Sequence, residues 1–169
     1  MFSLFASNSY LGIDFGDQIR VAEYKDNTFK VKEYSNLTEA IKLDFNTKNV
    51  ITAIDSRQLQ IKFIDIPEDL GEEEIYQMLE LEFEESGLIL QYEVIDYFNK
   101  RYVVALAVKK ELLKDQFQNL KSIGLKPQAV ETEFHANVRF LYQQHPGLQE
   151  TVSVINIAEN KTDLIIAKD

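Results

Sequence analysis

A short segment near the start of the chain has the residue types that could hold a phosphate group and a metal ion. It reads Leu11-Gly-Ile-Asp-Phe-Gly16, which puts Asp14 at the end of a predicted strand and Gly16 in the turn after it. A glycine turn can bring backbone N–H groups close to phosphate, and an aspartate there can hold Mg²⁺ through water. An ordinary β-turn uses the same two residue types and is the more frequent outcome for this spacing alone.

A second feature is a run of carboxylates that contains no basic residue. Its members are Glu68, Asp69, Glu72, Glu73, Glu74, Glu80, Glu82, Glu84 and Glu85. Asp69 followed by Glu72 predicts a capping box that opens a helix running to about Glu85, with Glu73, Glu80 and Glu84 on its outward side. A solvated face is the usual role of such a run. Like charges four residues apart destabilise a helix by about 0.2–0.5 kcal/mol per pair, which favours a partner-binding face. Both interpretations stay open.

The composition excludes several kinds of catalytic site. There is no cysteine, so disulfides, thiolate zinc sites, Fe–S clusters and thiol nucleophiles are ruled out. His135 and His145 are the only histidines and leave little for a metal site or a Ser-His-Asp triad. With 18 basic and 28 acidic residues, the net charge of −10 disfavours nucleic-acid binding and adsorption to an anionic membrane.

The chain also lacks the signals of export and of membrane insertion. Residues 1–7 have neither the basic region nor the long apolar region of a signal peptide. The longest apolar run, residues 103–108, is far shorter than the ~18–20 residues that cross a bilayer. We therefore expect a cytoplasmic protein whose membrane attachment, if it has any, comes from a segment outside these 169 residues.

The hydrophobic periodicity predicts an α/β fold with mixed sheets. In order, it indicates strands within 10–15, 19–24 and 29–34, a short helix near 37–45, strands 50–54 and 59–66, a helix over 69–85, strands 92–98 and 101–108 joined by a turn at Asn99-Lys100, a helix from Lys110 that ends at Gly124, a strand at 127–130, a helix over 132–144, and strands 151–157 and 162–167. The strand pattern breaks near residue 57 and returns at Pro127. This predicts an outer lobe formed by 1–57 and 126–169, an inserted lobe at 58–125, and a cleft between them.

The opening segment, followed by Ile19-Arg-Val-Ala-Glu23, resembles the start of actin-like ATPases. It is most similar to the PilM-type pilus assembly proteins and to the GspL-type cytoplasmic domains of type II secretion. The order of later segments is also similar to that family, namely Lys62-Phe-Ile-Asp-Ile-Pro67, Lys109-Lys-Glu-Leu-Leu113, Ile123-Gly-Leu-Lys-Pro127 and Ala129-Val-Glu-Thr-Glu133. A chain this short and divergent most resembles the platform proteins of bundle-forming pili. The resemblance implies a two-lobed, truncated actin-like (ribonuclease H-like) fold.

The two phosphate loops depart from the family pattern. Active members place small hydroxyl residues where Asp17 and Gln18 stand here, and a carboxylate there repels phosphate. The second loop reads Asp-x-Gly in ATP-binding members, but here it is Asn156-Ile-Ala158. The resemblance therefore implies degenerate phosphate-loop positions, which are Gly12, Asp14, Gly16, Asp17, Asn156 and Ala158. It argues against ATP hydrolysis, a bound cofactor or catalytic residues.

Two functions follow as hypotheses. The first is a non-catalytic scaffold at the cytoplasmic face of the bacterial inner membrane. It would belong to a type IV pilus or type II secretion platform, recruit the assembly ATPase and neighbouring platform proteins, and be able to form a homodimer. The second is a fragment of an actin-like ATPase or a sugar-kinase-like phosphotransferase. A generic α/β adaptor is a weaker third. The residues at 17, 18, 156 and 158 favour the scaffold.

Overall fold

The computed structural model describes residues 9–16, 18–25, 28–157 and 161–167. The chain divides into two compact units. One unit comprises Met1–Ser56 and Ile123–Asp169, and the other comprises Arg57–Ser122. Each unit is described separately below. That the two units form lobes on either side of a cleft stays a prediction.

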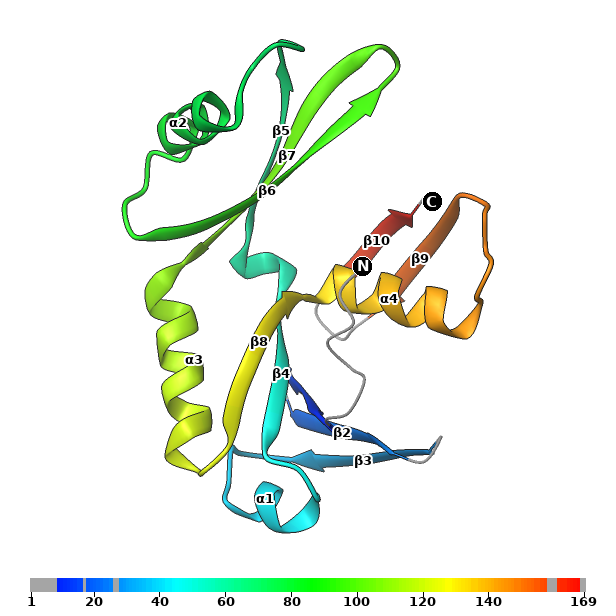
Figure 1. Cartoon of the computed structure of the whole chain (residues 1–169). Coiled ribbons are helices and arrows are strands. Elements are labelled where there is room, and N and C mark those ends of the chain that lie inside the picture. Colours follow the sequence, from blue (N-terminus) through cyan, green and yellow to red (C-terminus); the bar gives the residue numbers. More distant parts are fainter. Residues whose placement is uncertain (1–8, 17, 26–27, 158–160, 168–169) are drawn as a thin grey trace. The chain divides into compact units, whose positions relative to one another are not determined.

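A five-stranded mixed sheet forms the centre of the first unit (Figure 1). Its strands are β1 (Leu11–Phe15), β2 (Ile19–Lys25), β3 (Thr28–Tyr34), β4 (Asn49–Ile54) and β8 (Lys126–Thr132), in the order β3-β2-β1-β4-β8. The first three strands form an antiparallel meander, whereas β1 and β4, and β4 and β8, run parallel. The carboxyl ends of three parallel strands therefore lie at one edge of this sheet.

Buried and exposed side chains alternate along β1, β2 and β4, and the buried ones form the core of this unit. Leu11, Val21 and Val50 are fully buried. Glu23, which shares a face of β2 with Val21, is also buried, and it accepts hydrogen bonds at 3.3 Å from the backbone N–H and the side-chain Nδ2 of Asn46. Val21 and Glu23 therefore lie on the buried face of β2, and the buried carboxylate has donors that satisfy it.

A short helix, α1 (Ala40–Asp44), is joined to the exposed strand β3 by polar contacts. The Asp44 carboxylate forms an ion pair with Lys32 and accepts a hydrogen bond from the Tyr34 hydroxyl at 2.6 Å. Burial, and next the hydrogen bond to Asp44, raise the pKa of Tyr34 far above its ordinary value. Ile41 of α1 is fully buried, as its spacing from Phe45 predicts.

The last part of the first unit is a helix followed by a separate two-stranded sheet. Helix α4 (Glu133–Gln144) begins after Thr132, whose side-chain oxygen accepts a hydrogen bond from the His135 backbone N–H at 3.2 Å. Strands β9 (Val152–Ile157) and β10 (Thr162–Ala167) then pair antiparallel. Helix α4 has no fully buried residue, and Phe134, Val138 and Leu141, which the helical spacing places on one side, are half-buried.

The second unit has its own sheet and core. Strands β5 (Gln60–Ile66), β6 (Leu88–Tyr97) and β7 (Lys100–Lys109) form an antiparallel sheet in the order β5-β7-β6. Helix α2 (Glu72–Glu82) covers one face, and helix α3 (Lys110–Ser122) follows β7 directly. The buried cluster between α2 and the sheet consists of Ile66, Ile75, Leu79, Phe83, Val103, Ala105 and Ala107.

The sequence-based prediction places the start of α2 too early. Gly71 is the residue before the helix, and its backbone N–H donates to the Glu74 carboxylate at 2.9 Å. The expected cap, Asp69, lies instead in a turn in which the Leu70 N–H donates to the Pro67 carbonyl at 3.4 Å. Proline stops the preceding strand and forces this turn, so the helix starts later than the capping pattern predicts.

The hairpin between β6 and β7 also differs from the prediction. Its turn residues are Phe98 and Asn99, with φ values of 49° and 59°, and not Asn99 and Lys100. Two successive residues with positive φ are typical of a two-residue hairpin turn, which normally selects Asn or Gly rather than Phe. By contrast, Gly124 has the positive φ expected of a residue that ends a helix. In the described part of the chain, no helix is long and apolar enough to cross a membrane.

Candidate functional site

A lysine surrounded by three carboxylates is the main polar cluster of the first unit. The Lys161 ammonium lies 3.1 Å from Asp55 and 3.4 Å from Asp163, and it also forms an ion pair with Glu133. Ser56 donates a hydrogen bond to Asp163 at 2.9 Å. Only 13% of the Lys161 side chain is exposed. The cluster therefore brings together residues from three separate segments of the chain.

Each carboxylate is positioned by a different element. Asp55 directly follows β4, Glu133 is the first residue of α4, and Asp163 is the second residue of β10. The carboxyl end of a parallel strand and the start of a helix are the places where α/β proteins usually bind anionic or metal ligands. Here a side chain of the same protein brings the positive charge.

The environment of Lys161 keeps it charged. Burial by itself would lower the pKa of Lys161, but hydrogen bonds to Glu133 and Asp55 outweigh it and raise the pKa above the ordinary value. At neutral pH the ammonium therefore remains charged. Chemically, the arrangement is a salt bridge that joins the β9–β10 hairpin to β4 and α4.

The first candidate phosphate loop is also engaged within the protein. Asp14 lies opposite Arg20 in the β1–β2 pairing, with 3.9 Å between its carboxylate and the guanidinium, and Arg20 also contacts Glu33 at 3.1 Å. A Cβ atom added at Gly12 or Gly16 would meet only ordinary van der Waals contacts. Close packing of the backbone therefore does not explain these two glycines. Asp17 lies outside the described residues.

The two loops lie in different sheets. Gly12 and Asp14 belong to the five-stranded sheet, whereas Asn156 is paired with Asp163 in the two-stranded sheet. Ala158 lies outside the described residues. The sequence prediction missed Lys161 and its three carboxylates. One signal was present, because Asp55 directly follows a buried strand and Glu133 follows a capping threonine.

The acidic run of the second unit divides into paired and unpaired residues. Glu74 binds the start of α2, Glu82 pairs with Lys62 at 3.0 Å, and Glu85 pairs with Lys109 at 2.7 Å. The hydrogen bond from Lys109 lowers the pKa of Glu85.

Glu73, Glu80 and Glu84 are exposed, and none of them forms an ion pair with any other residue that the structure describes. The helix ends at Glu82, so Glu84 lies just beyond it and not on its outward side as expected. The described residues likewise contain no group of His, Cys, Asp or Glu that could hold a metal ion.

Comparison with known proteins identifies the fold. No protein-family model and no curated protein matches the chain. Among solved structures, a chain of the PilM–PilN type IV pilus biogenesis complex is 14% identical with a TM-score of 0.72, and the match covers 95% of this chain and 58% of that one. The cytoplasmic domain of EpsL, an inner-membrane component of the Vibrio cholerae type II secretion system, is 12% identical with a TM-score of 0.65, over 94% of this chain and 71% of that one.

A third similar structure is a Bacteroides thetaiotaomicron protein with an actin-like ATPase fold. It is 14% identical with a TM-score of 0.51, over 99% of this chain and 69% of that one. Together these matches confirm the expected α/β actin-like fold, of the kind found in PilM and EpsL. They do not confirm the narrower resemblance to bundle-forming-pilus proteins. The chain spans about three fifths of the matched PilM–PilN chain.

Proposed function

We propose that this protein is a non-catalytic scaffold of a type IV pilus or type II secretion platform at the cytoplasmic face of the bacterial inner membrane. The observation that carries the proposal is the match of 95% of the chain to a pilus biogenesis complex at a TM-score of 0.72. The match to EpsL, a component of a secretion system, points in the same direction. In this role the chain recruits the cytoplasmic assembly ATPase and neighbouring platform proteins.

The polar clusters of the first unit support a structural role rather than catalysis. An enzyme that transfers phosphate needs cationic and N–H groups free to meet the phosphate oxygens. Lys161 instead forms ion pairs with three carboxylates of its own chain, and the Asp14 carboxylate lies toward Arg20. These charges act within the protein and hold its parts together.

The acidic residues that lack internal partners support recruitment of a basic partner. Glu73, Glu80 and Glu84 are exposed, and charge of this kind speeds the encounter with a basic protein more than it strengthens the final complex. Exposed acidic residues contribute little to folding. A Glu73→Lys, Glu80→Lys and Glu84→Lys triple variant should therefore fold normally and associate more slowly with the assembly ATPase encoded by the same organism.

Binding kinetics over a salt series, with circular dichroism as the folding check, test this proposal. A matched control changes three exposed acidic residues elsewhere, Glu93, Glu111 and Glu150, to lysine, which alters the net charge equally. We expect the control to keep most of its association rate and the α2 variant to lose both rate and salt dependence. If the folded α2 variant binds like the parent with the same salt slope, the ATPase docks elsewhere. If the parent does not bind the ATPase, the proposal is wrong.

An actin-like ATPase or a sugar-kinase-like phosphotransferase remains the alternative, because one similar structure is described as having an actin-like ATPase fold. We expect calorimetric titration with Mg-ATP to give no binding at cellular concentrations. ATP hydrolysis that disappears in an Asp14→Ala variant would favour the alternative. Asp14 is half-exposed, so this change should not disturb folding.

A further inference from the structure

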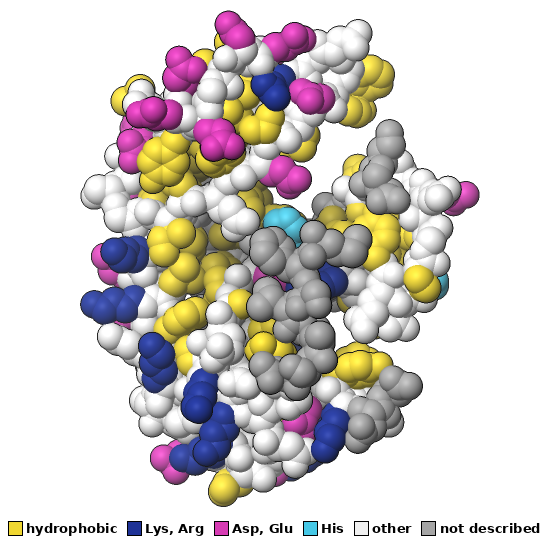
Figure 2. All heavy atoms as spheres, viewed as in Figure 1, with side chains coloured by type: hydrophobic (Ala, Val, Ile, Leu, Met, Phe, Trp, Pro, Cys, Tyr) yellow, Lys and Arg dark blue, Asp and Glu magenta, His cyan; other side chains and the backbone are white. Residues whose placement is uncertain are grey.

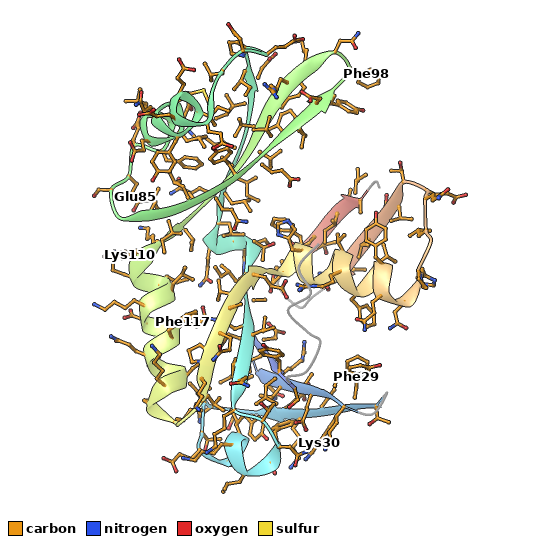
Figure 3. The ribbon with its side chains drawn as sticks, in the orientation of Figure 1. Phe29, Lys30, Glu85, Phe98, Lys110 and Phe117 are labelled. Carbon is orange, nitrogen blue, oxygen red and sulfur yellow. The ribbon has the colours of Figure 1, made fainter. Side chains whose placement is uncertain are left out.

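Helix α3 carries a stripe of lysines that no role described above uses. Lys110, Lys114 and Lys121 are exposed, and none of them pairs with another residue in the described part of the chain. At about 100° per residue they fall within about 40° of one another around the helix. Figure 2 shows Lys and Arg side chains gathered along this part of the molecule, and Figure 3 shows Lys110 and Phe117 on α3. The acidic residues of α3, Glu111 and Asp115, lie about 80–120° further round.

The first two lysines of this stripe do not stabilise their own helix. Lys110 and Lys114 are like charges four residues apart, which costs helix stability. Lys110 is also the first residue of α3, where the positive end of the helix dipole repels a cation. Lys121 lies in the last turn, where the dipole favours its charge, so the cost falls on Lys110 and Lys114, and an acidic surface that covers them would offset it.

The outward side of α2 has the complementary charge. Glu73, Gln77 and Glu80 are exposed at positions that face away from the buried residues Ile75 and Leu79. Glu80 lies in the last turn of α2, where the helix dipole also disfavours its charge. The neighbouring Leu81 is 82% exposed, which adds an apolar contact beside the charges. Figure 2 shows acidic side chains gathered in this region.

The two stripes match in spacing when the helices run antiparallel. Glu73 and Glu80 are seven residues apart, as are Lys114 and Lys121, so each pair spans about 10.5 Å along its helix. Antiparallel alignment places Glu73 against Lys121 and Glu80 against Lys114. Gln77 then faces the half-buried Phe117 between the two pairs. By sequence count, Glu84 and Lys110 continue the register beyond the end of α2. The alignment also sets Glu80 toward the positive N-terminal end of the facing α3, and Lys114 toward the negative C-terminal end of the facing α2.

We infer that α2 of one molecule docks on α3 of a second copy of this chain. The contact joins two different surfaces, so it is heterologous and can repeat from copy to copy. Exposed ion pairs are individually weak, so association in dilute solution is weak and sensitive to salt. It becomes effective where many copies are held together, as on a scaffold. The inference shares the acidic face of α2 with the proposed function and adds lysines that the proposed function does not need.

Charge reversal tests the contact. One variant changes Lys110, Lys114 and Lys121 to Glu, and the other changes Glu73, Glu80 and Glu84 to Lys. Analytical ultracentrifugation should show the parent associating at 0.1 M salt and dissociating at 1 M, where the screening length falls from about 10 Å to about 3 Å. Each variant alone should lose about tenfold in self-association. A mixture of the two variants should associate, because each then meets an oppositely charged face, and a variant with all six changes should recover the parent's behaviour.

The matched control changes Lys25, Lys48 and Lys126, exposed lysines of the first unit, to Glu and should keep most of the parent's self-association at 0.1 M salt. The inference is wrong if the parent stays monomeric at about 1 mM protein and 0.1 M salt, or if the folded Lys variant associates as the parent does. Binding of anionic vesicles that the Lys variant loses, with unchanged self-association, would assign the stripe to a lipid surface. The Lys variant keeps every acidic residue of α2, so its binding to the assembly ATPase tests the proposed function separately.

Discussion

Replacing Lys161 with methionine should destabilise the first unit, and the structure sets the size of the effect. Methionine keeps the length of the side chain and removes the ammonium that pairs with Asp55, Glu133 and Asp163. Breaking a fully buried ion pair costs 3–5 kcal/mol. Here the lysine is 13% exposed and the carboxylates are 17–23% exposed, so water screens part of the repulsion. We expect a loss of about 2 kcal/mol, or about 4–8 °C in the melting temperature.

The raised pKa of Lys161 determines how the stability loss of the variant depends on pH. In the parent, the raised pKa of Lys161 means that its contribution is complete below the ordinary lysine pKa and is lost only as pH rises through the higher folded-state value. Between pH 5 and pH 8 the parent therefore keeps this contribution in full, so the deficit of Lys161→Met should be about the same across that range. Glu133→Gln added to the variant should recover part of the loss.

Urea unfolding between pH 5 and pH 8, combined with hydrogen exchange of the β9–β10 hairpin, measures both effects. Lys109→Met is the matched control, because Lys109 forms a single exposed pair with Glu85 and its loss should leave stability almost unchanged. Exchange should quicken in β9 and β10 and stay unchanged in β5, β6 and β7. If Lys161→Met is as stable as the control at pH 7, or if its deficit grows as pH falls, the salt bridge does not hold the hairpin.

Three further changes test other parts of the fold. Phe98→Asn should raise the free energy of unfolding by about 0.5–1 kcal/mol, because Asn tolerates a positive φ and the 82% exposed ring of Phe98 contributes little burial, and chemical denaturation measures the gain (Figure 3). Glu23→Leu should lower the free energy of unfolding by about 1 kcal/mol, because two donors of Asn46 lose their acceptor. The hydrogen bond from Lys32 lowers the pKa of Asp44, so its contribution is present above the ordinary aspartate pKa and is lost as pH falls through the lower folded-state value. The Asp44→Asn variant should therefore be less stable than the parent at neutral pH, and this difference should shrink as the pH falls through the folded-state pKa of Asp44. Unfolding of both proteins over an acid pH series measures the difference.

The elements that the sequence predicts well are those whose signal is local. The alternation of β2, the apolar spacing of Ile75, Leu79 and Phe83, and the glycine that ends α3 each depend on residues a few positions apart. The start of α2 and the turn at Phe98 are predicted wrongly. In both cases a neighbouring constraint prevails, the proline turn before the helix and the register of β6 on β7.

The Lys161 cluster could not be predicted in the same way, because it depends on contacts between distant parts of the chain. Asp55 and Lys161 are separated by 106 positions, and only the folding of β4, α4 and β10 around each other brings them to 3.1 Å. The phosphate-loop resemblance directed attention to Asp14 and Asn156, which the structure places in different sheets. The phosphate-loop resemblance therefore leads to the correct fold but gives no indication of the Lys161 cluster.

The distribution of charge links the fold to the proposed role. Where carboxylates converge in the first unit, a lysine of the same chain forms ion pairs with them, so these charges interact within the protein. Where charge is left without an internal partner, on Glu73 and Glu80 of α2 and on the lysines of α3, it lies on exposed helix faces. Glu80 and Lys110 lie at helix ends where the dipole disfavours their charge, and a partner of opposite charge would offset that cost. The helix charges that lack an internal partner among the described residues therefore face solvent and other molecules, as the proposed scaffold role requires.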